Sequence, residues 1–490
     1  MARSSGEGGE GGAAGRPAAP AGPPWPPSVG RAVRALEGAP PSRPDVLVLG
    51  AGVAGLAAAR VLVNAGRRVR VLEARDRVGG RVFTHRPPGF AFPVELGAEF
   101  IHGTPPELLE LADAAGLVVV ESTEEHVARD ADGRVRARDA FSGPTGRLLD
   151  GLAEARRAPD QSVADYLAAR AAAVDADAAA VAQARAYVEG FHAAPADDAG
   201  VHGVAAAEDA ASGDEPAFRF AGGYDQVPRW LLDGAGPAPD LRLRTVVERV
   251  AWGADGVTVE ARGPQGAERH EAAACVVALP LGVLAAPAGA EGAVAFSPPI
   301  PALQAALAGL AVGHAVHVVL RFRRPFWWDD GAAAALDGVD PKTLAFVHAG
   351  DDAPLPVWWT QRAVRAPLLT GWAGGPAAER WAARPDAGRG LEALRTAGDL
   401  LGVAPDVRAR EFVAAYAHDW SADPYARGAY AYVRVGGEPA RAALGEPVGA
   451  GLVFAGEHTA ADGHHATVHG AIASGRRAAG QVLEALAARA

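Results

Sequence analysis

The sequence predicts an α/β fold with two closely connected domains, and three observations lead to this prediction. A length of 490 residues exceeds what one hydrophobic core usually organises. A glycine-rich turn follows a short apolar run near the N-terminus, and a second pattern of strand and helix lies near the C-terminus. Hydrophobic residues make up 49% of the chain and charged residues 21%, so most of it can bury a core.

The first predicted strand is the apolar run DVLVLG at residues 45–50, which continues into the GxGxxG pattern GAGVAG. Gly50 permits a tight turn, and Gly52 lets backbone N–H groups approach a pyrophosphate. Gly55 allows a helix over 53–64 to pack closely on the strand. The predicted nucleotide contacts of this loop are Gly50, Gly52, Val53, Ala54 and Gly55.

A second strand is predicted in RRVRVLEA, residues 67–74, and it ends at Glu73. An acidic residue at this distance from the glycine loop binds the ribose hydroxyls of an adenosine. Strand, glycine loop, helix, strand and acid together predict a Rossmann-like dinucleotide site. The fingerprint alone does not choose between NAD and FAD.

The next segments are more specific, because LEARDRVGGRV (72–82) and VELGAEFIHG (94–103) resemble the flavin amine oxidase family. That family includes polyamine oxidases, monoamine oxidases and lysine-specific histone demethylases. The resemblance implies FAD, with Glu73 on the adenosine ribose and with Arg75 and Arg81 near the ribose, pyrophosphate or ribityl chain. The further cofactor contacts that it implies are Ala74, Gly80 and, at the adenine, Val247.

At the far end, LVFAGEHTA (452–460) predicts a strand that ends in Gly456 and Glu457, followed by a helix over 466–486. The N-terminus of that helix presents unpaired N–H groups, which stabilise negative charge on a reduced flavin ring. By resemblance, Glu457 lies at the polar chain of the flavin, and Thr467 and Val468 lie beneath the ring.

The domain organisation follows from these motifs. We expect residues 1–43, rich in Ala, Gly and Pro, to form a disordered tail. A Rossmann-like FAD-binding domain is expected from 44–125, 217–285 and 445–490, with a hairpin over 245–261. An interleaved α+β substrate domain is expected from 126–216 and 286–444, with a mobile acidic loop at 206–216 and a strand within 313–328.

Candidate substrate contacts come from WSADPYARGAYAY (420–432), where the resemblance implies that Trp420 and Tyr430 are aromatic walls near the flavin. Ordinary aromatic packing is the alternative for each. His102 matches a position that faces substrate in animal-type polyamine oxidases, or it is a satisfied core histidine. Thr467 stands where several polyamine and monoamine oxidases have tyrosine and where the histone demethylases have threonine.

The largest departure from the family is at His317, which takes the place of a lysine that holds a water against flavin N5. Lys342, the only lysine in the chain, lies well outside this segment. A histidine can hold the same water through a ring nitrogen, and its chemistry suits proton transfer near neutral pH. It can equally mean altered oxygen reactivity or none.

The predicted function is oxidation of a primary or secondary amine of the polyamine-like kind, by hydride transfer to FAD and reoxidation by oxygen. The alternatives are an FAD dehydrogenase or desaturase with another acceptor, favoured by His317, and a decayed flavin-binding scaffold. L-amino acid oxidation is less favoured, because residues 94–103 contain no arginine for a carboxylate.

Several classes of partner are disfavoured by composition. A net charge of -11 argues against nucleic-acid binding. The N-terminal residues lack the apolar core of a secretory signal, so we expect a cytoplasmic protein without a membrane anchor. Cys275 is the sole cysteine, which excludes an intramolecular disulfide, favours noncovalent FAD and leaves no cysteine-cluster metal site.

Overall fold

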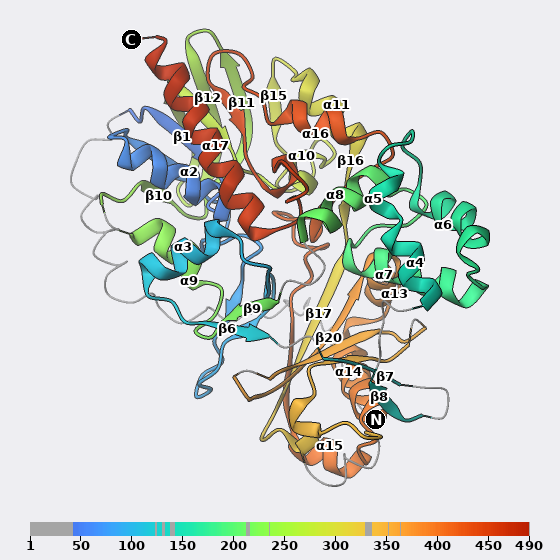
Figure 1. Cartoon of the computed structure of the whole chain (residues 1–490). Helices are drawn as coiled ribbons and strands as arrows, with labels where there is room; N and C mark the ends of the chain where they lie inside the picture. Colours follow the sequence, from blue (N-terminus) through green and yellow to red (C-terminus); the bar gives the residue numbers. More distant parts are fainter. Residues whose placement is uncertain are drawn as a thin grey trace, which may run out of the picture.

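The computed structural model describes residues 43–122, 125–129, 133–137, 143–211, 216–234, 236–328, 336–350, 352–362 and 364–489. The predicted tail, residues 1–43, lies outside these ranges except for Arg43. Figure 1 shows an upper lobe that contains β1 (Val46–Leu49), α2 (Val53–Asn64) and the last helix, α17 (Val468–Ala487). A lower lobe is built around the long strands β17 (Ala315–Phe322) and β20 (Ala366–Gly374).

A parallel sheet organises the upper lobe, with the strand order β10 (Asp240–Arg242), β2 (Val69–Leu72), β1, β14 (Ala274–Val277) and β23 (Leu452–Phe454). Side chains of a strand alternate between its two faces. Val46 and Val48 pack with α2 and α17, whereas Leu47 and Leu49 pack with an antiparallel sheet on the other face. Both faces are therefore covered, which explains why the central strand β1 and its neighbours β14 and β23 are apolar throughout.

The covering sheet has the order β13 (Gly266–Ala272), β12 (Gly256–Gly263), β11 (Val246–Gly253) and β15 (Ala295–Ser297). Strands β11 and β12 pair antiparallel from Val246 opposite Arg262 to Gly253 opposite Gly256. The hairpin predicted over 245–261 is therefore confirmed. Strand β15 pairs in parallel with β11, so part of the segment 286–444, assigned from the sequence to the substrate domain, joins the upper lobe.

The loop between β1 and α2 adopts a conformation that requires glycine. Gly50 has a φ of +97°, and a Cβ there would lie 2.8 Å from the carbonyl oxygen of Ala278. A Cβ on Gly55 would lie 2.0 Å from the carbonyl oxygen of Gly50, so only glycine lets α2 begin this close to the strand. A Cβ on Gly52 would instead enter open space, with no described atom within 4 Å.

The two ends of the chain meet where α17 packs on α2. A Cβ on Gly475 would lie 2.2 Å from the carbonyl oxygen of Ala54, so the helices approach at backbone distance. Ile472, Ala478 and Val482 of α17 share one buried core with Leu56 and Leu62 of α2. The N-terminus of α17 is thereby held near the glycine loop.

The lower lobe contains a sheet in the order β21 (Phe412–Ala417), β17, β20, β19 (Val357–Gln361), β18 (Phe346–His348), β7 (His126–Arg129) and β8 (Val135–Ala137). Helices α13 (Gly375–Ala382) and α14 (Asp386–Leu400) bury one face of it, with Trp358 and Trp381 in the shared core. A helical layer beside the sheet has its own core and consists of α4 (Gly143–Asp150), α5 (Leu152–Ala155), α6 (Val163–Ala171), α7 (Ala178–Phe191) and α8 (Val201–Ala211).

Shorter elements complete the fold, and some of them carry site residues. The strands are β3 (Thr84–His85), β4 (Val94–Glu95), β5 (Ile101–His102), β6 (Val119–Ser122), β9 (Ala217–Phe220), β16 (Leu310–Gly313) and β22 (Tyr430–Val433). The helices are α3 (Pro106–Ala115), α9 (Gln226–Asp233), α10 (Leu281–Leu284), α11 (Pro301–Gly309), α15 (Pro405–Glu411) and α16 (Glu438–Leu444).

The prediction of an acidic loop at 206–216 is wrong for residues 206–211, which form the second half of helix α8. The alanine-rich composition of this segment favours a helix, and the helix buries Val204, Ala205 and Ala206. Residues 212–215 lie outside the described residues. Among all the described residues, no helix combines the length and the apolar character needed to cross a membrane.

Candidate active site

A cavity of about 710 Å³ runs between the two lobes. Its lining includes the glycine loop after β1 at one end, and side chains of α7, α8 and the lower sheet at the other. This volume is within the range of pockets that hold cofactors and small ligands. Every predicted site residue except Gly55 lines it, and Gly55 instead packs against the loop backbone.

The nucleotide end of the cavity is organised by Glu73, at the end of β2. Its Oε2 accepts a hydrogen bond from the Ala51 N–H at 2.7 Å, and its Oε1 accepts one from the Arg75 N–H at 2.9 Å. The carboxylate is thus fixed beside the open space at Gly52. The other predicted contacts that line this end are Gly50, Val53, Ala54, Ala74, Gly80 and Val247.

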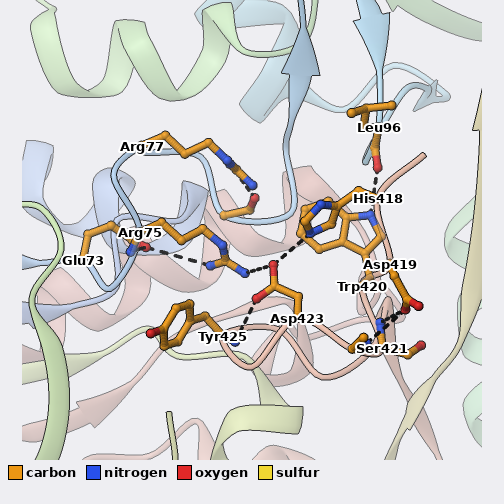
Figure 2. Close-up of polar contacts among 12 residues, drawn as sticks. Glu73, Arg75, Arg77, Leu96, His418, Asp419, Trp420, Ser421, Asp423 and Tyr425 are labelled. Carbon is orange, nitrogen blue, oxygen red and sulfur yellow. Dashed lines mark hydrogen bonds and ion pairs between the residues drawn. The ribbon is translucent and has the colours of Figure 1, made fainter. Parts of the chain in front are cut away.

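Arg75 is anchored by a partner that the sequence analysis did not single out as a functional residue. Its Nη2 lies 2.8 Å from Oδ2 of Asp423, which also contacts Nε2 of His418 at 2.8 Å (Figure 2). Although burial raises the pKa of Asp423, the hydrogen bond from His418 and the charge of Arg75 hold it below the usual range. The ionised Asp423 therefore ties the nucleotide end to the turn that carries Trp420.

Trp420 is buried in that turn, and its indole N–H donates to the carbonyl oxygen of Leu96 at 2.8 Å (Figure 2). Its ring lies against His418, with 4.2 Å between the ring centroids. Tyr430, on β22, donates its hydroxyl hydrogen to the carbonyl oxygen of Phe191 at 2.9 Å. Both aromatic rings line the cavity, and their role as walls for a substrate stays a prediction.

The middle of the cavity contains an ion pair from the two ends of the chain. Arg81 Nη1 donates to Oε1 of Glu457 at 2.8 Å, and the Ala466 N–H donates to Oε2 at 3.1 Å. Burial raises the pKa of Glu457, but the charge and the hydrogen bond of Arg81 lower it more, so the carboxylate is ionised. This pair holds the loop after Gly456 next to the start of α17.

Thr467 is the N-cap of α17, because its side-chain oxygen accepts the N–H of Gly470 at 3.0 Å. Thr467 and Val468 line the cavity, so the positive end of the helix dipole lies at its wall. A negatively charged group there is stabilised. The geometry fits the predicted place of these residues beneath a flavin ring.

His317 lies in the middle of β17 and lines the same cavity. Its Nε2 is 3.1 Å from Oε2 of the buried Glu99. His102 lies on β5, with its ring beside Phe100 and Phe191, and desolvation lowers its pKa. Both histidines line the cavity, and their roles toward a substrate stay predictions.

Sequence reasoning missed Glu208 because it assigned this residue to a loop. The carboxylate of Glu208 lies 2.7 Å from Nε2 of His192 and 3.3 Å from the hydroxyl of Tyr187, and all three residues line the cavity. The alanine-rich composition of α8 was the signal that predicts a helix here. Glu99 was also missed, although a charge inside the segment VELGAEFIHG was a visible exception.

The cavity has the nucleotide fingerprint at one end and the N-terminus of α17 at its middle. The sequence profile described as flavin containing amine oxidoreductase matches residues 53–483. The chain belongs to this family.

Two relatives, named polyamine oxidase and putrescine oxidase, match this chain over most of their length. Polyamine oxidase 4 of Oryza sativa subsp. japonica is 28% identical over 481 residues, which cover 89% of this chain and 88% of that protein. Putrescine oxidase of Kocuria rosea is 29% identical over 481 residues, covering 90% of this chain and 95% of that protein. The enzyme is therefore an FAD-dependent amine oxidase, and the dehydrogenase, desaturase and scaffold alternatives are not favoured.

Solved structures show the same fold. Putrescine oxidase bound to putrescine superposes with a TM-score of 0.74 at 24% identity, covering 90% of this chain and 99% of that one. Cyclohexylamine oxidase from Brevibacterium oxydans gives 0.73 at 23% identity, covering 91% and 100%. The predicted α/β flavoprotein fold is confirmed.

The residues present fit a flavin dinucleotide. The open space at Gly52, the fixed carboxylate of Glu73 and the dipole at Thr467 occur in the order that a long dinucleotide needs. Among the described residues, no group of three or more histidine, cysteine or acidic side chains is arranged to bind a metal ion.

Proposed function

We propose that this enzyme oxidises a small primary or secondary amine of the polyamine type, with noncovalently bound FAD and with oxygen as the final acceptor. One observation carries the proposal: a continuous cavity joins the nucleotide end to an end lined by aromatic rings and the carboxylate of Glu208. Relatives named polyamine oxidase and putrescine oxidase support this substrate class. When bound, FAD supplies the hydride acceptor for the carbon beside the amine nitrogen.

The protein's own groups orient the amine and exclude water. Tyr430 is held by its hydrogen bond to the backbone of Phe191, and Trp420 is held by its hydrogen bond to the backbone of Leu96. The rings of Trp420 and Tyr430 can therefore enclose an alkyl amine. An aromatic face also attracts a cationic group. Glu208, held by His192, offers a negative charge to a second ammonium group at the far end of a diamine.

The test is anaerobic mixing of the purified flavoprotein with a panel of monoamines, diamines and polyamines, followed by admission of oxygen. We expect diamines or polyamines to bleach the flavin absorbance, and oxygen to restore it. Bleaching by no amine would refute the substrate class. Bleaching without recovery in oxygen would refute oxygen as the acceptor and indicate another electron carrier.

Noncovalent attachment is supported by the position of Cys275, the sole cysteine. It is buried in β14 within the core of the upper lobe and is not among the cavity-lining residues. Burial also raises the pKa of its thiol, which disfavours the reactive thiolate. Denaturation followed by filtration should release all of the yellow flavin. Flavin retained with the denatured chain would contradict the proposal.

We further propose that His317 partly replaces the lysine of the family in flavin reoxidation. Its ring lines the cavity, and its proposed role is to hold a water or donate a proton during reoxidation of the flavin. His317→Ala should slow reoxidation of the reduced flavin by oxygen more than it slows reduction by the amine, and His317→Lys should preserve or accelerate reoxidation. Stopped-flow absorbance measures the two half-reactions separately.

A matched control for this experiment is His314→Ala. His314 lies three residues earlier, contacts Ser421 at 2.8 Å and is not among the residues that line the cavity. It should leave both half-reactions near the wild-type rates. Unchanged reoxidation in both His317 variants would remove His317 from the mechanism. The expected cytoplasmic location, and the expected lack of nucleic-acid and membrane partners, stay predictions.

A further inference from the structure

Glu99 is a buried carboxylate at the junction of the two lobes, on the segment that follows β4. Glu99 is 6% exposed and His317 is 4% exposed, and their Oε2 and Nε2 atoms lie 3.1 Å apart. Arg219, on β9, completes the group, and it is also buried. Three segments far apart in the sequence thus bring a carboxylate, an imidazole and a guanidinium together inside the protein.

The two oxygens of Glu99 have different surroundings. Oε1 accepts hydrogen bonds from Nε1 of Trp359 at 3.0 Å and from Nε2 of Gln361 at 2.6 Å. Nε of Arg219 lies 3.4 Å from the same oxygen. All these donors therefore approach one side of the carboxylate.

Oε2 faces His317. Among the described residues, neither Oε2 nor the two ring nitrogens of His317 has an aligned hydrogen-bond partner, although Oε2 and Nε2 are within hydrogen-bond distance. The ring is confined by Trp359 and Trp372, at centroid distances of 5.3 and 6.1 Å.

The charge of Glu99 determines which ring nitrogen of His317 carries the hydrogen. Burial raises the pKa of Glu99, but the charge of Arg219 and the contact with His317 lower it more, to about 2. The carboxylate is ionised near neutral pH, and an ionised carboxylate only accepts hydrogen bonds. The nitrogen that faces it must therefore carry a hydrogen.

We propose that Glu99 is the positioning residue for His317: it holds the proton on Nε2, so that Nδ1, which is buried and has no hydrogen-bond partner among the described residues, is left as the acceptor nitrogen of the ring. This inference rests on the proposed function of His317 at the cavity wall. The carboxylate also stabilises an imidazolium if Nδ1 takes a proton from a bound group, as carboxylate–histidine pairs do elsewhere.

Glu99→Gln is a sharp test, because the local donors dictate how the amide must lie. Trp359 and Gln361 donate hydrogen bonds to Oε1, and the positive charge of Arg219 lies 3.4 Å from it, so the amide oxygen occupies that position. The amide NH₂ then faces Nε2 of His317 and requires a lone pair there. The substitution should therefore move the ring proton from Nε2 to Nδ1.

Glu95→Gln is the matched control. Glu95 lies four residues earlier in the chain, and its carboxylate contacts Thr84 and the backbone N–H of Tyr224 instead of His317. Burial raises its pKa to about 8, so an uncharged amide imitates the state that it already has near neutral pH. The tautomer of His317 should be unaffected by this change.

The tautomer is measured on the holoenzyme with ¹⁵N-labelled histidine, by NMR spectra that correlate ring nitrogens with ring hydrogens, using His317→Ala to assign the signal. We expect Nε2–H in the wild type and in Glu99→Gln the inverted pattern, with Glu95→Gln like the wild type. A proton on Nδ1 in the wild type, or no change in Glu99→Gln, would overturn the inference. The wild-type spectrum decides the matter even if Glu99→Gln does not fold.

This measurement is independent of the proposed function. If His317→Ala leaves reoxidation unchanged while the tautomers follow the expected pattern, the proposed role of His317 fails and the positioning by Glu99 stands. If reoxidation depends on His317 while the wild-type ring is protonated on Nδ1, the positioning by Glu99 fails and the role of His317 stands.

Discussion

Replacing Glu73 with alanine should weaken FAD binding. In the folded protein its carboxylate accepts the N–H groups of Ala51 and Arg75, at 2.7 and 2.9 Å. The same group lines the cavity beside Gly52, where the ribose of the adenosine is expected. The substitution therefore removes a ligand contact and also leaves two backbone donors without their acceptor.

The two effects have different sizes and different readouts. Loss of a charge-assisted hydrogen bond to the ribose costs about 1.5–3 kcal/mol, which is roughly a 10- to 150-fold rise in the Kd for FAD. The freed N–H of Arg75 borders the cavity, whereas Ala51 is fully buried, so its N–H is left without an acceptor and the loss of apoprotein stability should be ~1–3 kcal/mol. Flavin fluorescence titration measures the first effect, and urea unfolding of the apoprotein measures the second.

Two further variants make the result interpretable. Glu73→Gln keeps one acceptor oxygen and should fall between the wild type and Glu73→Ala in both assays. Asp76→Ala removes an exposed carboxylate that lies 3.6 Å from Arg244 and should change either quantity little. A Kd for Glu73→Ala close to that of the wild type would refute the assignment of this carboxylate to the ribose.

Two other predictions concern the aromatic walls and a buried acid. Tyr430→Ala and Trp420→Ala should slow flavin reduction by the amine more than they weaken FAD binding, and normal turnover in both would refute the proposed enclosure. Glu95, with a pKa raised by burial to about 8 from 4.5, keeps a proton in the folded protein that the unfolded chain releases. Stability should therefore fall as pH rises from about 4.5 to about 8, by at most ~5 kcal/mol. Urea unfolding should show that Glu95→Gln removes most of this fall; an equal fall in both proteins would contradict the reasoning.

The nucleotide end could be predicted in detail because its information is local. The positions of Gly50, Gly52 and Gly55 are set within one turn of chain, and their steric needs follow from the strand and helix on either side. Glu73 follows at the end of the next strand. The hairpin over 245–261 was predicted for the same reason, since alternation along its strands is visible in the sequence.

The far half of the cavity could be predicted only in part. The resemblance located His317, Tyr430 and His102, and all three line the cavity. Glu208 was misassigned, because a short run of acidic residues among alanines suits either a loop or the exposed face of a helix. Packing of α8 against the neighbouring helices decided for the helix.

Short motifs in the sequence predicted the fold class, and the family resemblance that they carry predicted the cofactor and the family to which this oxidase belongs. Only the tertiary structure showed that Asp423 holds Arg75 and that Glu99 lies between Arg219 and His317. These partners are far apart in the sequence, so no periodicity or spacing connects them. An unpaired buried charge is costly, so the charges that become buried when the two lobes pack together are paired with one another. The whole fold decides which charges become buried.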